Sequence, residues 1–387
     1  MRHKIYSNLR NVLCLALPFM ALSLMTACSD HDSTTLPGDA TTSGLTFTAT
    51  SDKAVTRIGL NESEIDAGEN EPVIWINGDK FSFNFVKPGE SSGLVYEFIA
   101  SNVRNNGLSC DMNPAPGFNI PNGTYRVYVL NPGRPGNFVG GALSGTTIDL
   151  TGQSQPKEED LDNYSNLSDY YYQHAYTLVD MENNEIVYGN TSLSFTTITS
   201  MLRFNIRNQL GEEIKVKDIT LTYSGSDNKQ FYDKGAFDWS TATPTLNPAA
   251  AATFNKAHLK TDQVLGSALG SRFNAYMSIF PTTGYSAGST EKLNIVIKLD
   301  IDSEAKKAVF ENLDVNLFDT ENGAVCKFDA GVRTLFNLNI TAARIQDYND
   351  SDDDGDSEGK ISAQGFGKGG ASALQNGGTV TATHRND

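Results

Sequence analysis

The sequence predicts an all-β fold with two tandem antiparallel β-sandwich domains and a disordered C-terminal tail. Apolar residues alternate with polar residues in many short runs, which places the apolar side chains on one face of each strand. Gly, Pro, Asn and Asp separate these runs, as expected for turns between short antiparallel strands. The chain of 387 residues is longer than a single hydrophobic core usually serves, so two domains are expected.

The predicted strands follow this alternation along the chain. The clearest runs span residues 45–49, 81–85, 125–129 and 202–206. Further strands are predicted at residues 73–76, 95–100, 186–188, 193–195, 214–223, 273–280, 293–301, 315–318 and 335–341. Residues 262–269 and 303–309 favour short helices instead. Many short strands and few helices favour antiparallel sandwiches over a parallel sheet with helical crossovers.

The chain divides into segments of different composition. A polar stretch near the start and an acidic, Gly-rich stretch at the end lack the apolar residues that a folded core needs. Between the two sandwiches, the turn signal Gly189-Asn190 precedes a new alternating run. The predicted segments are a signal peptide at 1–27, a tether at 28–44, an N-terminal sandwich domain at 45–192, a C-terminal sandwich domain at 193–347 and a tail at 348–387.

The first 27 residues have the layout of an export signal. A basic start precedes an apolar run at 12–24, which is shorter than the ~20 residues that span a bilayer. The run ends in Leu-Met-Thr-Ala-Cys at 24–28, the pattern of a small residue followed by cysteine that a lipoprotein signal peptidase reads. We therefore expect cleavage before Cys28 and lipidation of Cys28. An ordinary signal peptide with a cysteine nearby by chance is the alternative.

Charge and cysteine usage exclude some classes of function. The formal net charge of −16 makes the chain a poor partner for the phosphates of nucleic acid. Of the four cysteines, Cys14 leaves with the signal peptide and Cys28 carries the lipid. The remaining Cys110 and Cys326 are far apart in sequence, so no disulfide framework is indicated.

Catalytic and metal-binding motifs are present only as fragments. The acidic run at 350–361 begins like a calcium loop, but Ile361 at its twelfth position cannot supply the closing carboxylate. Residues 284–288, Gly-Tyr-Ser-Ala-Gly, match the nucleophile-elbow string without a following helix pattern. The sequence therefore predicts neither an enzyme nor a cofactor or metal site.

The tyrosines Tyr170, Tyr171 and Tyr172 are candidate glycan-binding residues. A tyrosine ring stacks on the apolar side of a pyranose while its hydroxyl stays in water. A structural role is the alternative, because tyrosine also favours half-buried sheet surfaces.

Arg57 is a candidate site of proteolytic maturation, with Ile58 as the new N-terminus. It stands between the predicted strands at 45–50 and 73–76. Cleavage there by an arginine-directed protease would detach the lipidated segment together with its strand. The groove left behind would have unpaired backbone groups, which a strand from another subunit could fill. A surface arginine in a loop is the alternative interpretation.

Several of these patterns together resemble the Bacteroidetes fimbrillin superfamily of two-domain pilus proteins, the type V pilins. They are the lipidation motif at Cys28, the early strand followed by Thr56-Arg57, and residues 73–81 (VIWINGDKF), 122–128 (NGTYRVY), 201–206 (MLRFNI) and 330–338 (AGVRTLFNL). The resemblance covers most of the chain and lies in the order and spacing of these motifs.

This resemblance implies two transthyretin-like sandwiches, export as a lipoprotein to the cell outer membrane, and protease-triggered polymerisation by strand exchange. The expected function is that of a structural subunit of a cell-surface fimbrium in adhesion and biofilm formation. The expected partners are other fimbrial subunits, host or bacterial surface receptors and, before processing, the outer membrane.

One feature departs from the family pattern, in which the last strand lies near the chain end. Here about forty residues follow it, and within them only residues 379–383 alternate as a donor strand would. This favours a tip or accessory subunit over a main-stalk subunit. The alternative function is a permanently anchored surface lipoprotein that binds glycans.

Overall fold

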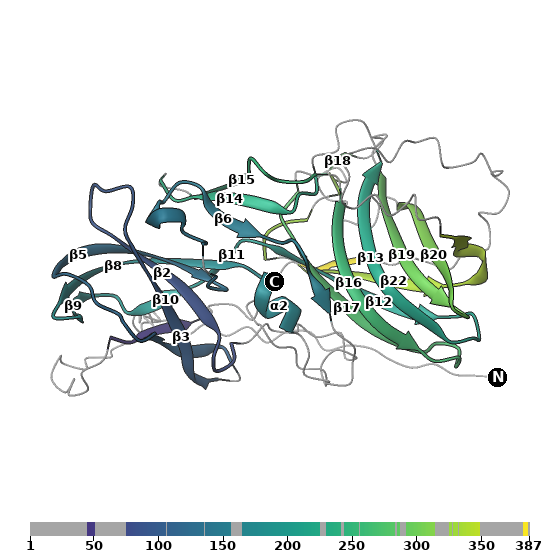
Figure 1. Cartoon of the computed structure of the whole chain (residues 1–387), viewed down its shortest axis with the longest axis horizontal. Coiled ribbons are helices and arrows are strands. Elements are labelled where there is room, and N and C mark those ends of the chain that lie inside the picture. Colours follow the sequence, from purple (N-terminus) through teal and green to yellow (C-terminus); the bar gives the residue numbers. More distant parts are fainter. Residues whose placement is uncertain are drawn as a thin grey trace, which may run out of the picture. The chain divides into compact units, whose positions relative to one another are not determined.

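The computed structural model describes the chain from residue 45 to residue 385 with gaps (Figure 1). The described residues are 45–50, 75–105, 107–134, 136–155, 165–224, 230–240, 244–254, 256–282, 285–286, 292–313, 325–326, 328–331, 333–348 and 382–385. They are almost entirely β-structure, which confirms the predicted fold class. The one α-helix among them is the short α2 (Ser165–Tyr170).

A nine-stranded sheet forms the first half of the described chain. Its strands run in the order β10-β1-β4-β3-β2-β5-β8-β11, with β9 paired to β8. All neighbours are antiparallel except β1 and β10. The bounds are β1 Phe47–Thr50, β2 Lys80–Val86, β3 Leu94–Arg104, β4 Ser109–Pro114, β5 Gly123–Asn131, β8 Gln173–Glu182, β9 Glu185–Gly189, β10 Ser192–Ser194 and β11 Thr196–Thr197.

This sheet curls around its own core, because β10 lies near β8 although β1, β4, β3, β2 and β5 separate the two strands in the sheet order. Aromatic side chains fill the interior. The rings of Phe83 and Phe98 stack with centroids 3.9 Å apart, and Phe47 packs against both.

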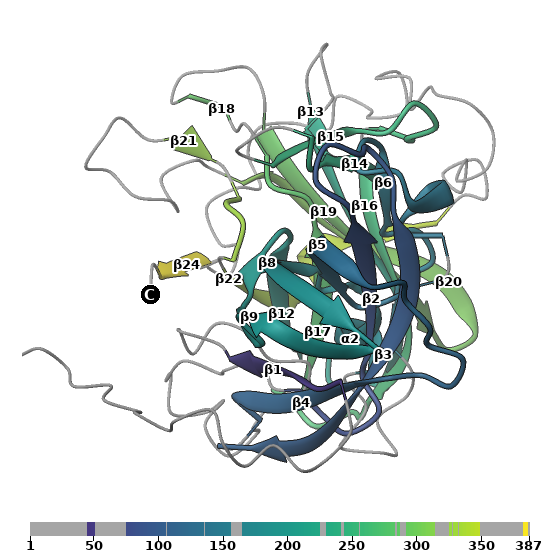
Figure 2. The same ribbon diagram turned by 90° about the vertical axis from the view of Figure 1, so that its left-hand side faces the viewer.

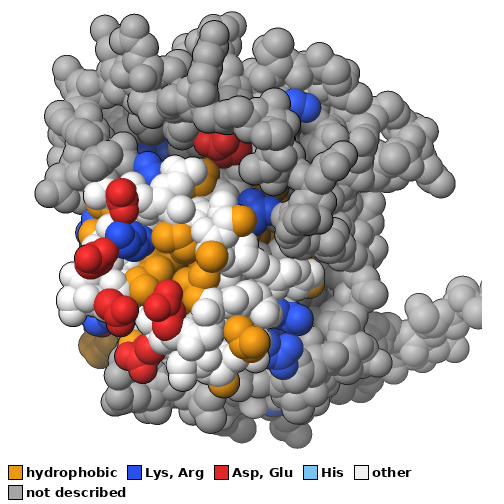
Figure 3. All heavy atoms as spheres, turned by 90° about the vertical axis from the view of Figure 1, so that its right-hand side faces the viewer, with side chains coloured by type: hydrophobic (Ala, Val, Ile, Leu, Met, Phe, Trp, Pro, Cys, Tyr) orange, Lys and Arg blue, Asp and Glu red, His pale blue; other side chains and the backbone are white. Residues whose placement is uncertain are grey.

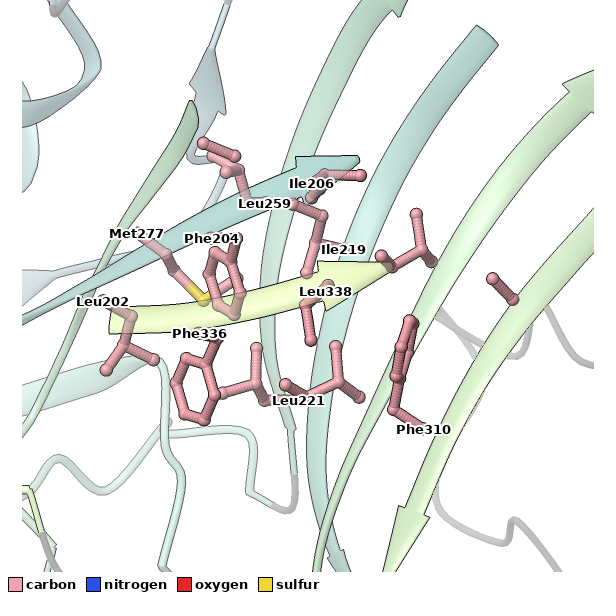
Figure 4. Packing of buried hydrophobic residues seen from close by; sticks show 14 of the residues in the cluster. Leu202, Phe204, Ile206, Ile219, Leu221, Leu259, Met277, Phe310, Phe336 and Leu338 are labelled. Carbon is pink, nitrogen blue, oxygen red and sulfur yellow. The ribbon is translucent and has the colours of Figure 1, made fainter. Parts of the chain in front are cut away.

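The second half contains two sheets that pack face to face as a sandwich. One has the order β17-β12-β22-β24, and the other has the order β23-β20-β19-β13-β16-β7. Figure 4 shows the side chains between them, including Phe204, Phe336 and Leu338. The bounds are β12 Ser200–Asn208, β17 Arg272–Ile279, β22 Arg333–Ile340 and β24 Ala382–Arg385, and β7 Ser154–Gln155, β13 Ile214–Ser224, β16 Lys256–Leu265, β19 Lys292–Ile301, β20 Glu304–Leu313 and β23 Ile345–Asp347.

Small elements join or cover these sheets. A three-stranded sheet in the order β15-β14-β6 links β6 from the first half of the chain to two strands from the second half. The predicted domain boundary at 192/193 stays a prediction. Strands β6 and β7 precede it in sequence and pair with β14 and β16, which follow it. The bounds are β6 Thr146–Asp149, β14 Lys234–Asp238, β15 Thr245–Pro248, β18 Tyr285–Ser286, β21 Val325–Cys326, and the 3-10 turns η1 Val139–Gly141 and η3 Ala342–Arg344.

The two predicted helices are wrong. Residues 256–265 and 304–313 form β16 and β20, which pair with β13 and β19. The sequence reading missed the turn before β20, where Asp302 and Ser303 both adopt positive φ (51° and 68°). Such a two-residue turn matches the twist of a β-hairpin and returns the chain along β19. Tertiary pairing thus overrides the local helical preference of this stretch.

Strand β24 (Ala382–Arg385) lies in the predicted disordered tail and overlaps the run at 379–383 that alternates as a donor strand would. It pairs antiparallel with β22, with Thr334 opposite His384 and Phe336 opposite Ala382. The edge strand β22 offers unpaired backbone groups, which a short chain segment can satisfy whatever its composition.

The side-chain amides of two glutamines hydrogen-bond to the backbone at the edge of β17, where a neighbouring strand would otherwise pair. The Gln153 amide donates to the carbonyl of Ser278 (2.7 Å) and accepts the N–H of Ser278 (2.8 Å). Gln155 likewise donates to the carbonyl of Asn274 (2.9 Å) and accepts the N–H of Tyr276 (2.9 Å). Because β7 also pairs with β16 through its backbone, this segment connects the edges of both sheets.

We expect the Gln153→Ala substitution to lower the free energy of unfolding by about 1–3 kcal/mol, because it leaves two buried backbone groups of Ser278 without partners. Urea unfolding measures the change. The exposed Gln346 of β23 provides the matched control, and Gln346→Ala should change the stability by less than about 0.5 kcal/mol. Equal effects of the two substitutions would contradict the role of Gln153.

Candidate functional site

Strand β1 is a four-residue strand of the first sheet that has a neighbouring strand on each side. It pairs antiparallel with β4, where Phe47 is opposite Met112 and Ala49 is opposite Cys110. On its other side it pairs in parallel with β10, where Ala49 is opposite Leu193. Figure 2 shows β1 beside β4. The sheet is therefore continuous only as long as this four-residue strand is present.

The side chains of β1 alternate between core and surface. Leu45 just before the strand, Phe47 and Ala49 are 5%, 0% and 0% exposed. The Phe47 ring lies 5.1 Å from that of Phe83 and 5.9 Å from that of Phe98, measured between centroids. Burial of the two large side chains contributes about 1.5–3 kcal/mol each. Hydrophobic packing therefore helps to hold β1 between β4 and β10.

Polar contacts fix the register of β1. The backbone N–H of Thr48 donates to the carbonyl of Thr191 at 2.8 Å. The Thr46 hydroxyl lies 2.9 Å from Oδ1 of Asn113 and donates to it. Because a slip of one residue would turn Phe47 to the surface and a threonine into the core, the pattern admits a single register.

Two buried ionisable side chains lie near β1. Cys110 is on β4, and Asp79 directly precedes β2. Burial raises the pKa of the Cys110 thiol to about 12, so this thiol stays protonated and is a poor nucleophile. Burial also raises the pKa of Asp79 to about 6, although its Oδ2 accepts the backbone N–H of Ile76 at 2.9 Å. Both side chains are buried in the fold around β1, as structural side chains are.

The three candidate glycan-binding tyrosines do not form a common surface. Tyr171 and Tyr172 are both 0% exposed and belong to two different hydrophobic clusters. Tyr170 is half-buried, and the Arg134 guanidinium lies 4.5 Å from its ring centroid. A sugar ring cannot reach Tyr171 or Tyr172, so the expectation of a platform made by this triplet is corrected. The rings serve as core and as a stacking partner, as the alternative interpretation held.

The other candidate residues lie outside the described parts of the chain. Cys28, Arg57 and Ile58 are in this group, as is the acidic run at 350–361. Within the parts of the chain that the structure describes, no three His, Cys, Asp or Glu side chains gather in a way that could hold a metal ion. None of the helices in those parts is long and apolar enough to cross a membrane.

Strand β4 has no clear strand signal in the sequence. Its residues Ser-Cys-Asp-Met-Asn-Pro contain turn formers, and only Cys110 and Met112 alternate as core residues. The signal that could have found the slot is the strict alternation of β1 itself, which requires two neighbouring strands to bury it.

No protein-family model matches the chain, and no curated protein matches it. Solved structures described as "putative cell adhesion protein" from three Bacteroides species are similar to it at low identity. The one from Bacteroides uniformis is 13% identical, covers 80% of this chain and 96% of its own, and has a TM-score of 0.38. The one from Bacteroides ovatus is 10% identical and covers 79% and 98% with a TM-score of 0.40. The one from Bacteroides fragilis is 12% identical and covers 73% and 89% with a TM-score of 0.40.

We expect the Phe47→Ala substitution to lower the free energy of unfolding by about 3–5 kcal/mol, because it opens a cavity among Phe83, Phe85 and Phe98. Chemical denaturation followed by intrinsic fluorescence measures the change. The control is Thr50→Ala in the same strand, which loses only a long 3.4 Å contact to the Leu193 carbonyl and should cost less than about 1 kcal/mol. Similar costs at both positions would show that Phe47 does not hold β1 in place.

The stability of the fold should depend on the ionisation of Asp79. Its pKa of about 6 in the folded protein exceeds the value of about 3.9 expected in the unfolded chain. Its contribution to stability is therefore complete below about pH 4 and is lost as the pH rises through 6. We expect Asp79→Asn to be about 1–2 kcal/mol more stable than the wild type at pH 7 and nearly equal to it at pH 4.

Urea titrations of both proteins at the two pH values test this expectation for Asp79. The difference between the proteins isolates this group, because all other titrating groups contribute to both. The asparagine keeps an oxygen that can accept the N–H of Ile76. A difference between the two proteins that is the same at pH 4 and pH 7 would contradict the assignment.

Proposed function

We propose that the protein is a structural subunit of a cell-surface fimbrium that acts in adhesion and biofilm formation and assembles by strand exchange. The observation that carries this proposal is the slot of β1. A four-residue strand with a buried Phe47 and Ala49 completes the sheet between β4 and β10. Its sequence connection to β2 runs through residues 51–74, which contain Arg57.

Removal of β1 would create a specific acceptor. The edges of β4 and β10 would lose their backbone partners, and the space of Leu45, Phe47 and Ala49 would become an apolar groove. Main-chain pairing gives affinity in such strand addition, and pockets for alternate side chains give specificity. An extended segment of a second subunit with the same alternation fits this groove and would join the two molecules.

The end of the chain is a candidate donor of that segment. Strand β24 already pairs as an added strand on β22, so this part of the chain can adopt the extended form that donation requires. A subunit that carries a long segment after its last sandwich strand is, in this proposal, a tip or accessory subunit rather than the main stalk.

Lipidation at Cys28 would place the unprocessed subunit on the cell outer membrane. Cleavage after Arg57 would release it from the lipid and open the groove in a single step. The same cut thus couples transport to assembly, since a subunit cannot polymerise while its own β1 fills the sheet.

An arginine-specific protease should convert the purified full chain into fibres that are visible by electron microscopy. N-terminal sequencing of the cut protein should give Ile58, because cleavage after Arg57 precedes it. The Arg57→Gln variant is the matched control and should remain uncut at this position and unpolymerised. Fibres formed by the uncut Arg57→Gln variant would refute the proposal. Cut wild-type protein that stays monomeric even when mixed with other fimbrial subunits from the same cells would also refute it.

A peptide with the sequence of residues 45–50 tests whether the groove is the acceptor. Added in excess to cut protein, it should occupy the groove and stop fibre growth, because it restores the native β1 contacts. The same peptide with aspartate in place of Phe47 should have no effect, since a charge cannot enter the core. Equal inhibition by both peptides would exclude the β1 groove as the site of assembly.

A further inference from the structure

The outer face of β8 and β9 carries exposed side chains of a kind that folded chains usually bury. Tyr176, Leu178 and Tyr188 are 53%, 47% and 74% exposed. Tyr188 is paired with Asp180, which is on the same face of β8 as Tyr176 and Leu178 because side chains alternate along a strand. The three side chains therefore lie on the same face of the sheet, and we call this surface the tyrosine face.

The tyrosine face continues a part of the sheet that is covered. Next to it on β5, Tyr128 is 6% exposed and its ring lies 5.2 Å from that of Tyr176 and 5.2 Å from that of Trp239. Beyond Tyr176 the cover ends, and β8 and β9 lie toward the viewer in Figure 2. Among the described residues, Tyr176 and Tyr188 are the aromatic side chains classed as exposed.

The opposite side of the molecule has a different character. In Figure 3, hydrophobic side chains gather in the middle of the described surface and acidic side chains border them. The exposed large hydrophobic residues of the second half, Val264 and Leu269, are aliphatic. They lack the planar rings that a stacking surface needs.

Polar side chains border the tyrosine face. Arg126 on β5 is opposite Leu178 and is exposed. Asp180 is two residues after Leu178 on the same face of β8 and is opposite Tyr188 on β9. A guanidinium and a carboxylate thus stand within one strand spacing of the exposed rings, where they can bind hydroxyl groups of a ligand.

The size of this surface limits what can bind it. Side chains of this kind present about 150–250 Å² when fully accessible, so the exposed parts of the three sum to roughly 350 Å². A stable protein interface needs about 800 Å² on each partner. The tyrosine face is therefore too small to hold a second copy of this chain by itself.

We propose that the tyrosine face binds a neutral polysaccharide by stacking of sugar rings on Tyr176 and Tyr188. A pyranose offers an apolar face to a tyrosine ring, and its hydroxyl groups match Arg126 and Asp180. Tyr176 is four residues from Asp180 on β8, and Tyr188 is opposite Asp180, so the rings are about 13 Å apart along the strand. This span fits several consecutive sugars with Leu178 beneath the middle ones. Acidic Glu182 and Glu185 at the hairpin disfavour anionic chains.

Affinity electrophoresis of the purified full chain tests this inference. The probes are a mixed-linkage β-glucan, glycogen, a mannan and an arabinoxylan, with heparin as the anionic comparison. We expect retardation by at least one neutral polysaccharide and none by heparin. Tyr176→Ala and Tyr188→Ala should each weaken binding about tenfold, because each removes one stacking ring.

Two controls separate ring stacking from general effects. Tyr188→Phe keeps the ring and should bind within about threefold of the wild type. Leu269→Ala removes a side chain that is 69% exposed in the second half and should bind as the wild type does. Retardation by none of the neutral probes, retardation that the alanine variants retain, or a dimer in sedimentation velocity that Tyr188→Ala dissociates would overturn the proposal. The assay uses uncut protein, so its outcome is independent of polymerisation.

Discussion

The first sheet depends on the burial of one alternating strand. Leu45, Phe47 and Ala49 enter a core of phenylalanines, and the backbone of β1 joins β4 to β10. Without these contacts, the curl of the sheet loses its closing strand and both neighbours become edges. The proposed cleavage after Arg57 would separate this short strand from the rest of the sheet. In the proposed function, the contacts that stabilise this sheet are the same ones that assembly would replace.

Edges are managed differently in the second half. Gln153 and Gln155 use side-chain amides as substitutes for a strand backbone and satisfy the outer edge of β17. On the other side of that sheet, β24 covers β22. An edge strand that is closed in this way cannot pair with a second molecule. Among the described strands, loss of the short β1 would expose the backbone of both its neighbours, and the tyrosine face is an exposed part of the same sheet.

The success of strand prediction depended on how clearly each strand separates its faces. In β19 the inward positions are Leu293, Ile295, Ile297 and Leu299, so the strand was evident from the sequence. Strand β8 was not predicted, because its inward side chains include Gln173 and Thr177 while its outward ones include Tyr176 and Leu178. Such mixing arises where the outer face of a sheet also contacts other elements or stays available to a ligand. The binary pattern cannot show either case.

Alternation over a few residues is enough to predict the all-β class, the burial of β1 and half of the ten strands of the second sandwich, namely β12, β13, β17, β19 and β22. Tertiary structure decided which strands are neighbours, that Tyr171 and Tyr172 are core side chains, and that Tyr176 and Tyr188 share one exposed face. These outcomes depend on contacts between residues far apart in the chain, such as Ala49 with Leu193 and Gln153 with Ser278. Local propensity carries no information on such pairings, which is why only the folded chain shows them.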